Sequence, residues 1–204
     1  MRILRRHYSF PVKIQRRITV RFISNSSSII TNDSLFQSRI KEANSRCKDT
    51  VELRNLDERG WGVYARRDFT KGETVIRSRA LQIHPTSSTH TIQTGWNTHV
   101  TMDLPAILLN HSCSPNLSIQ VNNDGAYDFV AMLPIQANEE VHFDYETCEY
   151  DFAMKCLCDS NNCKGELKGY KYHGPSILQA HGTKGVAPYL VSKPNNHTFD
   201  LITS

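Results

Sequence analysis

The chain has 204 residues and a mass of 23.3 kDa, which suits one domain with room for a short leader or tail. Its 39% hydrophobic and 22% charged residues exclude a collagenous or disordered chain. The mean hydropathy of −0.46, without an apolar run near the ~20 residues of a membrane helix, argues against an integral membrane protein. Six cysteines are too few for a disulfide scaffold at this length but enough for one metal site.

The net charge of +4 originates in the first part of the chain. Residues 1–32 hold seven Lys and Arg residues and no acidic residue. The remainder has 17 of the 24 basic residues against all 20 acidic ones, a net charge of −3. A nucleic-acid-binding protein is expected to carry a basic face on its folded body, so this distribution argues against direct nucleic-acid binding.

The same first segment, residues 1–32, is rich in Arg and Ser, which is typical of an organelle transit peptide. It lacks the apolar core of a secretory signal. We expect a mitochondrial leader, because a basic segment is drawn to an anionic membrane surface. A plastid leader, a disordered basic tail and a nuclear localisation patch are the alternatives.

Beyond the leader, the pattern predicts one helix at 34–46 and then a β-rich domain of short strands broken by turn residues. Alternation on both sides of Asn122-Asn123-Asp124-Gly125 predicts a hairpin. Helix is otherwise expected only as a short turn at 106–109, and the polar tail after about residue 183 is expected to be a loose surface extension. The expected strands are 62–65, 73–77, 81–83, 91–93, 98–102, 117–121, 127–132 and 141–145.

Three cysteines within eight residues, Cys156, Cys158 and Cys163, indicate a metal site. Thiolates bind Zn²⁺, and a structural zinc site needs four tetrahedral ligands, so a fourth ligand must come from elsewhere. Free buried thiols or a disulfide are the alternatives. The candidates for the fourth ligand are Cys47, Cys113, Cys148 and a histidine.

A second motif, Asn-His-Ser-Cys-Ser-Pro-Asn at 110–116, follows the apolar residues 107–109. Its amide and imidazole side chains need several polar partners, although a capped turn fixed by Pro115 would also explain it. Two weaker motifs flank it in the chain. Two glycines around Trp61 let the backbone approach a ligand closely, and two glutamates at 139–140 precede a strand that ends in Tyr145.

Together, and in this order, the four motifs resemble the SET-domain protein-lysine methyltransferases with a C-terminal post-SET zinc motif. The resemblance covers about residues 50–168. It implies a mainly β fold, the β-clip of small curved sheets with a pseudoknot that brings Asn110 and His111 beside Tyr145. It divides the chain into the leader at 1–32, a SET domain at 49–148, a post-SET zinc motif at 152–168 and a C-terminal extension at 169–204.

The resemblance also implies the roles of individual residues. Tyr145 is the expected catalytic residue, which orients the amine and the methyl group, and Phe143 and His142 are expected in the lysine channel. A Phe at position 143 leaves room for di- and trimethylation. The S-adenosylmethionine pocket would be lined by Gly60, Trp61, Gly62, Asn110, His111 and Tyr145. The structural zinc would be held by Cys113, Cys156, Cys158 and Cys163.

The sequence departs from the family at several points. His142 stands where a small residue such as Thr is common, Asn138 replaces a common Gly, and no cysteine-rich region precedes the domain. We expect a monomeric transferase that uses S-adenosylmethionine and a structural Zn²⁺, acts on an exposed lysine of a protein partner, and binds neither membrane nor nucleic acid. The rivals are a catalytically silent SET module that binds a partner and a nuclear histone-lysine methyltransferase.

Overall fold

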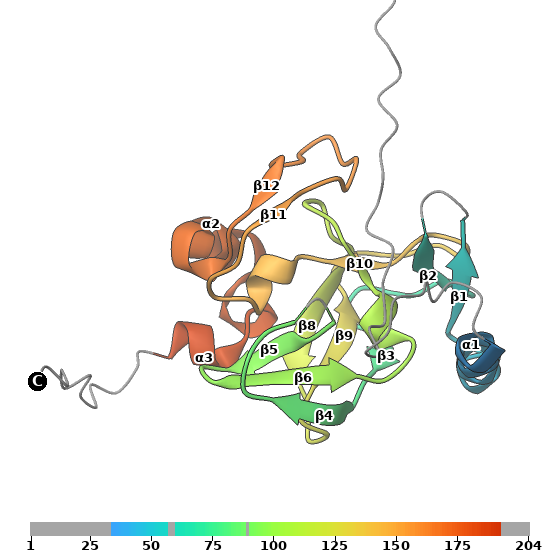
Figure 1. Ribbon diagram of the computed structural model, residues 1–204. Coiled ribbons are helices and arrows are strands. Elements are labelled where there is room, and N and C mark those ends of the chain that lie inside the picture. The colour runs from blue at the N-terminus through green and yellow to red at the C-terminus, as the bar shows by residue number, and fades with distance from the viewer. Residues whose placement is uncertain (1–33, 57–59, 89, 193–204) are drawn as a thin grey trace, which may run out of the picture.

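The structure is a computed structural model that describes residues 34–56, 60–88 and 90–192 (Figure 1). The expected leader at 1–32 lies outside the described residues, as does the end of the expected C-terminal extension. No helix in the described ranges is both long enough and apolar enough to span a membrane.

The described chain is mainly β, as expected, and its strands are short (Figure 1). Strand β8 and the 3-10 turn η2 begin where the sequence pattern predicted. The elements in chain order are α1 (Ser34–Arg46), β1 (Val51–Asn55), β2 (Trp61–Ala65), β3 (Thr74–Arg77), β4 (Ala80–His84), β5 (Ile92–Gly95), β6 (Thr98–Met102), η2 (Ala106–Leu108), β7 (Asn110–His111), β8 (Leu117–Val121), β9 (Tyr127–Ala131), β10 (His142–Phe143), η3 (Tyr145–Thr147), β11 (Met154–Lys155), β12 (Glu166–Leu167), α2 (Tyr170–His181), η4 (Thr183–Gly185) and α3 (Pro188–Val191).

The strands form small sheets rather than one large one. Two are three-stranded and antiparallel, in the orders β3-β9-β8 and β4-β6-β5, and β1-β2 and β11-β12 are two-stranded antiparallel ribbons. The predicted hairpin joins β8 to β9. Its turn is fixed because the Asn122 side-chain oxygen accepts the Asp124 N–H at 2.9 Å and because Gly125 takes a φ of +73°, which disfavours other residues.

One pairing differs from the others because it is parallel. Strand β7 lies beside β10 with Asn110 opposite His142, and the Ser112 N–H donates to the Phe143 carbonyl at 3.1 Å. Parallel neighbours cannot be joined by a tight turn, and here the β8-β9 hairpin lies between them in the chain. The pairing brings residues 110–111 next to the start of η3, where Tyr145 lies.

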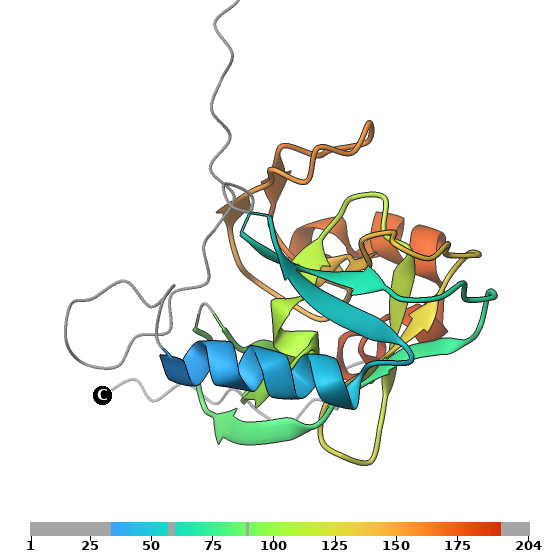
Figure 2. The same cartoon turned by 90° about the vertical axis from the view of Figure 1, so that its right-hand side faces the viewer.

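Helix α1 packs across one side of the body, below β1 and β2 (Figure 2). Its buried residues Phe36, Ile40 and Ala43 follow the helical spacing of one apolar face. The Phe36 ring meets the Trp61 indole edge-on, with ring centroids 5.7 Å apart. The helix therefore supports the strand that carries the glycine-flanked tryptophan.

The expectation of scarce helix and a loose tail after about residue 183 is wrong for the described residues. Helix α2 occupies Tyr170–His181, and Val186, Ala187 and Leu190 are buried beyond it. The Ala187 N–H donates to the Thr147 carbonyl at 2.8 Å, which ties this segment to η3. The few apolar residues of this segment face the body. Gly and Pro residues between them hide the helical spacing of these apolar residues, so the sequence pattern did not predict the helix.

Some strand predictions also need correction. Strands β1, β7, β11 and β12 were not predicted. Strands β7, β11 and β12 have two residues each and are too short to show a pattern, whereas the alternation of β1 over residues 51–54 was a signal that was missed. The strand expected at 141–145 is limited to His142–Phe143, because the Asp144 side chain accepts the Glu146 N–H at 3.1 Å and caps η3. Tyr145 therefore opens a helical turn instead of ending a strand.

Candidate active site and metal site

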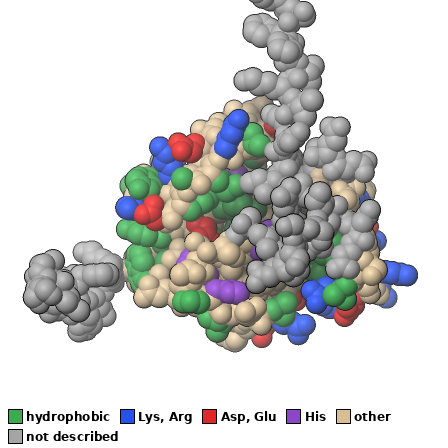
Figure 3. Space-filling model, viewed as in Figure 1, with side chains coloured by type: hydrophobic (Ala, Val, Ile, Leu, Met, Phe, Trp, Pro, Cys, Tyr) green, Lys and Arg blue, Asp and Glu red, His purple; other side chains and the backbone are tan. Residues whose placement is uncertain are grey.

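A cavity of about 430 Å³ separates the β11-β12 ribbon from the body. Apolar side chains gather in this region of the surface (Figure 3). Polar groups enter the cavity at a few points only, which is the usual make-up of a small-molecule site. The lining includes Ile92, Val100, Met102, Leu108, Leu109, Asn110, His111, Phe143, Tyr145, Glu149, Phe152, Met154, Leu157 and Leu167.

Tyr145 lies at the wall of this cavity. Its hydroxyl donates to the Leu109 carbonyl at 2.8 Å, and its ring centroid lies 5.3 Å from that of His111 and 4.9 Å from that of Phe143. Burial raises the pKa of the Tyr145 phenol well above its usual value. The phenol therefore keeps its proton at neutral pH and can orient a neighbouring group through its oxygen.

Asn110 joins three of the sequence motifs. Its side-chain N–H₂ donates to the Trp61 carbonyl at 3.1 Å and to Glu140 Oε1 at 2.9 Å, while Glu140 Oε2 accepts the Tyr64 hydroxyl at 3.2 Å. A Cβ placed on Gly62 would lie 2.7 Å from Glu140 Oε1, so a larger residue would displace the Glu140 carboxylate from this position. Sequence reasoning missed Glu140, although the adjacent pair 139–140 was a signal, since one member of such a pair can turn inward.

The glycine-flanked segment touches the site only through its backbone. Trp61 packs against Phe36, its indole N–H has no hydrogen-bond partner among the described residues, and neither Gly60, Trp61 nor Gly62 lines the cavity. Of the six residues expected to bind the methyl donor, the structure brings Asn110, His111 and Tyr145 to the cavity and leaves these three outside its lining.

The two expected channel residues lie on opposite faces of β10, as successive strand residues do. Phe143 lines the cavity and contacts the ring of Phe129 at a centroid distance of 5.0 Å. His142 points instead toward Glu140, with Nε2 3.4 Å from Oε1. Only Phe143 is thus placed where it can limit the space at Tyr145.

His111 is held as a neutral ring. Its Nδ1 accepts the Tyr145 N–H at 3.2 Å, so the neutral tautomer carries its proton on Nε2, which lies 3.3 Å from Cys113 Sγ. Burial lowers the pKa of His111 to about 4, against the opposing charge of Asp144. The imidazole therefore bridges the cavity wall and the cysteine cluster without carrying charge at neutral pH.

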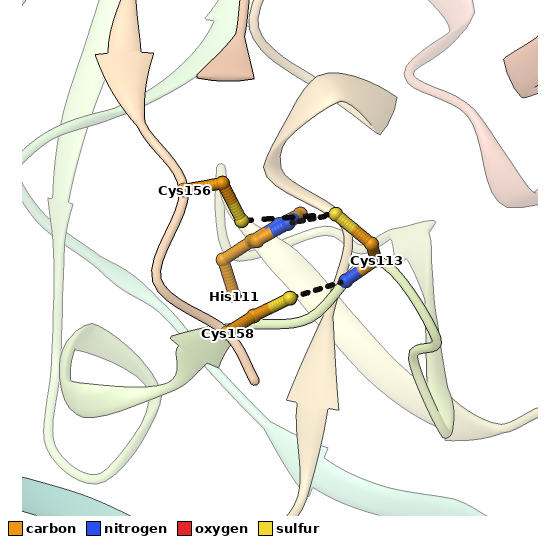
Figure 4. Close-up of side chains that lie close together, drawn as sticks. All are labelled: His111, Cys113, Cys156 and Cys158. Atoms are coloured by element: carbon orange, nitrogen blue, oxygen red, sulfur yellow. Dashed lines mark hydrogen bonds between the residues drawn. The ribbon is translucent and has the colours of Figure 1, made fainter. Parts of the chain in front are cut away.

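Four side chains point toward one another beside the cavity: His111, Cys113, Cys156 and Cys158 (Figure 4). Their donor atoms all lie within 4.8 Å of one another, and the Sγ atoms of Cys113 and Cys156 are 3.7 Å apart. A tetrahedral zinc with Zn–S bonds of about 2.3 Å separates its sulfurs by about 3.8 Å. The donor set and its spacing therefore fit a Zn²⁺ ion.

The remaining expected ligand, Cys163, lies at the edge of this cluster. It is exposed, and its Sγ donates to the Cys156 carbonyl at 3.8 Å. The next backbone N–H, that of Lys164, donates to Cys113 Sγ at 3.4 Å. The structure thus gathers three of the four expected cysteines and adds His111. Cys47 and Cys148 lie outside the cluster, as expected of ordinary thiols.

A buried carboxylate fastens residues 164–173 to the body. Glu146 is fully buried, and its carboxylate accepts the backbone N–H groups of Lys168 and Gly169 at 2.9 and 3.0 Å and the His173 ring at 2.7 Å. Burial would raise the pKa of Glu146, but these bonds and the ion pair with Lys164 hold it below its ordinary value. Glu146 therefore positions the segment that closes the cavity.

Residues 60–146 match the family model described as the SET domain. The match begins at the glycine-flanked tryptophan and ends one residue after Tyr145, so it contains three of the four sequence motifs. Residues 60–146 are therefore similar to a SET domain, and for this region the resemblance found in the sequence is confirmed.

Among curated relatives, the chain is 40% identical over 65 residues to histone-lysine N-methyltransferase Set2 of Drosophila melanogaster, covering 30% of the chain. It is 37% identical over 73 residues to histone-lysine N-methyltransferase ASHR3 of Arabidopsis thaliana, covering 34%. It is 28% identical over 138 residues to histone-lysine N-methyltransferase NSD3 of Mus musculus, covering 57%.

The matches span only 3%, 14% and 10% of the length of these three relatives. All three names describe histone-lysine methyltransferases. They agree with the nuclear alternative for this chain, and no comparison supports the mitochondrial expectation.

Proposed function

We propose that this chain transfers a methyl group from S-adenosylmethionine to the side-chain amine of a lysine in a protein substrate. The observation that carries the proposal is the parallel pairing of β7 with β10, beside which Tyr145, Asn110 and Phe143 share one largely apolar cavity. The match of residues 60–146 to the SET domain and the names of the relatives support the same reaction.

The donor supplies a methyl group on a positively charged sulfur, so its leaving group departs neutral and needs no general acid. Asn110, His111 and Tyr145 line the cavity and would hold the donor, and the backbone of the glycine-flanked segment adjoins them through the bond from Asn110 to Trp61. The neutral His111 ring adds no positive charge beside the sulfonium.

The lysine must attack as a neutral amine, although its ordinary pKa is about 10.4. A dry cavity disfavours an ammonium ion and lowers that pKa, as does a nearby cation. The walls offered by Leu108, Leu109 and Phe143 are apolar and supply the dry surroundings. The Tyr145 hydroxyl, fixed on the Leu109 carbonyl, orients the amine, and the remaining contribution is alignment of nitrogen, methyl and sulfur.

We also propose a structural zinc held by Cys113, Cys156, Cys158 and Cys163. The tautomer of His111 supports Cys163 over the imidazole as the fourth ligand. A zinc-bound histidine usually donates its second ring N–H to a neighbour, whereas Nδ1 of His111 accepts from Tyr145 and leaves the proton on Nε2. The Cys163 thiol already lies beside the cluster, with its Sγ 3.8 Å from the Cys156 carbonyl oxygen.

The proposed reaction is tested by transfer of labelled methyl from S-adenosylmethionine into histone and organelle extracts. Tyr145→Phe should lower transfer at least about 100-fold. It should leave the fold intact, because the lost hydrogen bond contributes only about 1 kcal/mol. Glu42→Gln on the exposed face of α1 is the control and should act like the wild type.

A catalytically silent module would give a different result. The purified chain would then transfer no label into any extract, and a calorimetric titration with S-adenosylmethionine would show no saturable binding. Labelled bands in either extract that persist at full strength in Tyr145→Phe would contradict the role given to this tyrosine.

The substrate class and the location are linked. The relatives favour a histone, whereas the basic leader favours an organelle protein. A fluorescent fusion of residues 1–35 decides between nuclear and mitochondrial placement, and the extract that becomes labelled should agree with it.

A further inference from the structure

One charged side chain in the cavity has no part in the mechanism above. Glu149 lies one turn beyond Tyr145, and among the described residues it is the only carboxylate that lines the cavity. The surrounding wall, which includes Ile92, Val100 and Met102, is apolar. A single carboxylate in such a wall attracts cations, and a lysine side chain has the matching form, an apolar stem with a positive tip.

The Glu149 carboxylate is held in place by β5. Its Oε1 accepts the Gln93 N–H at 2.8 Å. Gln93 is fixed in turn, because its carbonyl accepts the Tyr127 hydroxyl at 2.8 Å and its side-chain oxygen accepts the Tyr150 N–H at 3.0 Å. The second carboxylate oxygen, Oε2, has no hydrogen-bond partner among the described residues. The carboxylate is thus fixed at one oxygen and available at the other.

The groups that face Glu149 supply no compensating positive charge. Burial raises the pKa of Glu149 to about 7, and its charge helps to raise the pKa of Tyr145, so the two side chains lie close enough to interact. The charge of Glu149 also helps to raise the pKa values of three further groups, which are Tyr127, Cys148 and Tyr189. His90 and Lys155 also line the cavity, and neither is among the groups that shift the pKa of Glu149.

We infer that Glu149 is a second catalytic residue, which binds the ammonium of the target lysine and accepts one of its protons. The inference rests on the proposed methyl transfer. One N–H bond of the ammonium breaks, an O–H bond forms on Glu149, and the electron pair stays on nitrogen. The neutral amine then bonds to the methyl carbon while the carbon–sulfur bond breaks and its electrons remain on sulfur.

The first test measures binding and needs no turnover. The probe is n-butylammonium, which reproduces the lysine stem and charge, and n-butanol is the neutral probe of equal length. At pH 8, nuclear magnetic resonance titration of the wild type should show saturable shifts at the methyl groups of Ile92, Val100 and Met102. Glu149→Gln should weaken binding of n-butylammonium at least about tenfold and leave n-butanol unchanged. Glu42→Gln removes the same charge from the exposed face of α1 and should bind like the wild type.

The second test follows methyl transfer against pH. In the wild type, kcat should rise with pH through about 7, as Glu149 loses its proton. Glu149→Gln should lose that rise, shift its optimum upward and lower kcat about 100-fold at pH 7.5. Equal probe affinity and an equal pH profile in the two proteins would overturn the inference while the proposed function stands. A different outcome is that n-butylammonium binds the wild type and not Glu149→Gln, while the wild type transfers no methyl group. The cation site at Glu149 would then stand, and the proposed function would be refuted.

Discussion

Phe143 shows how one side chain can set the product of the proposed reaction. Its ring stands 4.9 Å from that of Tyr145, on the face of β10 that lines the cavity. Phe143→Tyr adds a hydroxyl where a methylated amine would need space, and should lower the yield of di- and trimethyl product about tenfold in favour of monomethyl product. Mass spectrometry of the product peptide measures this ratio. An unchanged product distribution would show that this position does not limit the space.

Glu140 acts on the site through Asn110. Removing its carboxylate leaves the inward Asn110 N–H without its partner at 2.9 Å, which costs about 1–3 kcal/mol. Glu140→Ala should therefore weaken binding of S-adenosylmethionine at least about fivefold, measured by calorimetry.

The adjacent Glu139 gives a matched control, because it has the same side chain but is exposed. Glu139→Ala should bind S-adenosylmethionine like the wild type. Equal losses in Glu139→Ala and Glu140→Ala would mean that charge near β10 matters and that the bond to Asn110 does not.

At the scale of elements, the β11-β12 ribbon depends on its attachments to the body. The ribbon has only two residue pairs of its own, yet Met154 and Leu167 within it line the cavity. It is held by Glu146 on one side and by the cysteine cluster on the other. So short a ribbon is not stable alone, so its position must come from these contacts.

Zinc removal tests the cluster. Mass spectrometry of metals should find one Zn²⁺ per chain, and a chelator should lower the melting temperature and expose the ribbon to protease. Cys163→Ala should weaken zinc affinity more than about 100-fold, while Cys47→Ala should not change it. Full zinc retention in Cys163→Ala would instead identify His111 as the fourth ligand.

At the scale of the whole molecule, Glu149 makes stability depend on pH. Its pKa is about 7 in the folded chain, against an ordinary value of 4.5, so folding favours the protonated form. This contribution to the free energy of unfolding is complete below pH 4.5 and is lost as the pH rises through about 7.

Glu149→Gln cannot ionise and should escape this loss. Its melting temperature should equal that of the wild type at pH 4 and exceed it at pH 8, by about 2–4 °C for each 1 kcal/mol of the difference in a chain of this size. Thermal unfolding followed by circular dichroism at both pH values measures the difference. Asp144 and Glu146 have lowered pKa values, so their protonation reduces the free energy of unfolding at low pH. This loss is the same in the wild type and in Glu149→Gln, so it cancels in the difference between their melting temperatures.

The sequence by itself predicted the SET-domain match and the strand-rich fold, and both are confirmed. It also named Asn110, His111, Phe143 and Tyr145, which the structure brings to one cavity. These features could be predicted because they depend on residue types that lie close together in the chain. Examples are the asparagine–histidine pair at 110–111 and the cysteines at 156, 158 and 163. The hairpin between β8 and β9 could also be predicted, because the residues that form its turn are four adjacent ones. The domain boundaries and the leader stay predictions.

Only the tertiary structure decided which acidic residues matter. Between residues 139 and 149 the sequence offers glutamates that look alike: Glu139, Glu140, Glu146 and Glu149. One is exposed, one holds Asn110, one fastens residues 164–173 and one lines the cavity. The docked helix α2 was missed for the same reason. Burial and partners come from segments far apart in the chain, and these long-range contacts give a carboxylate or an apolar residue its role.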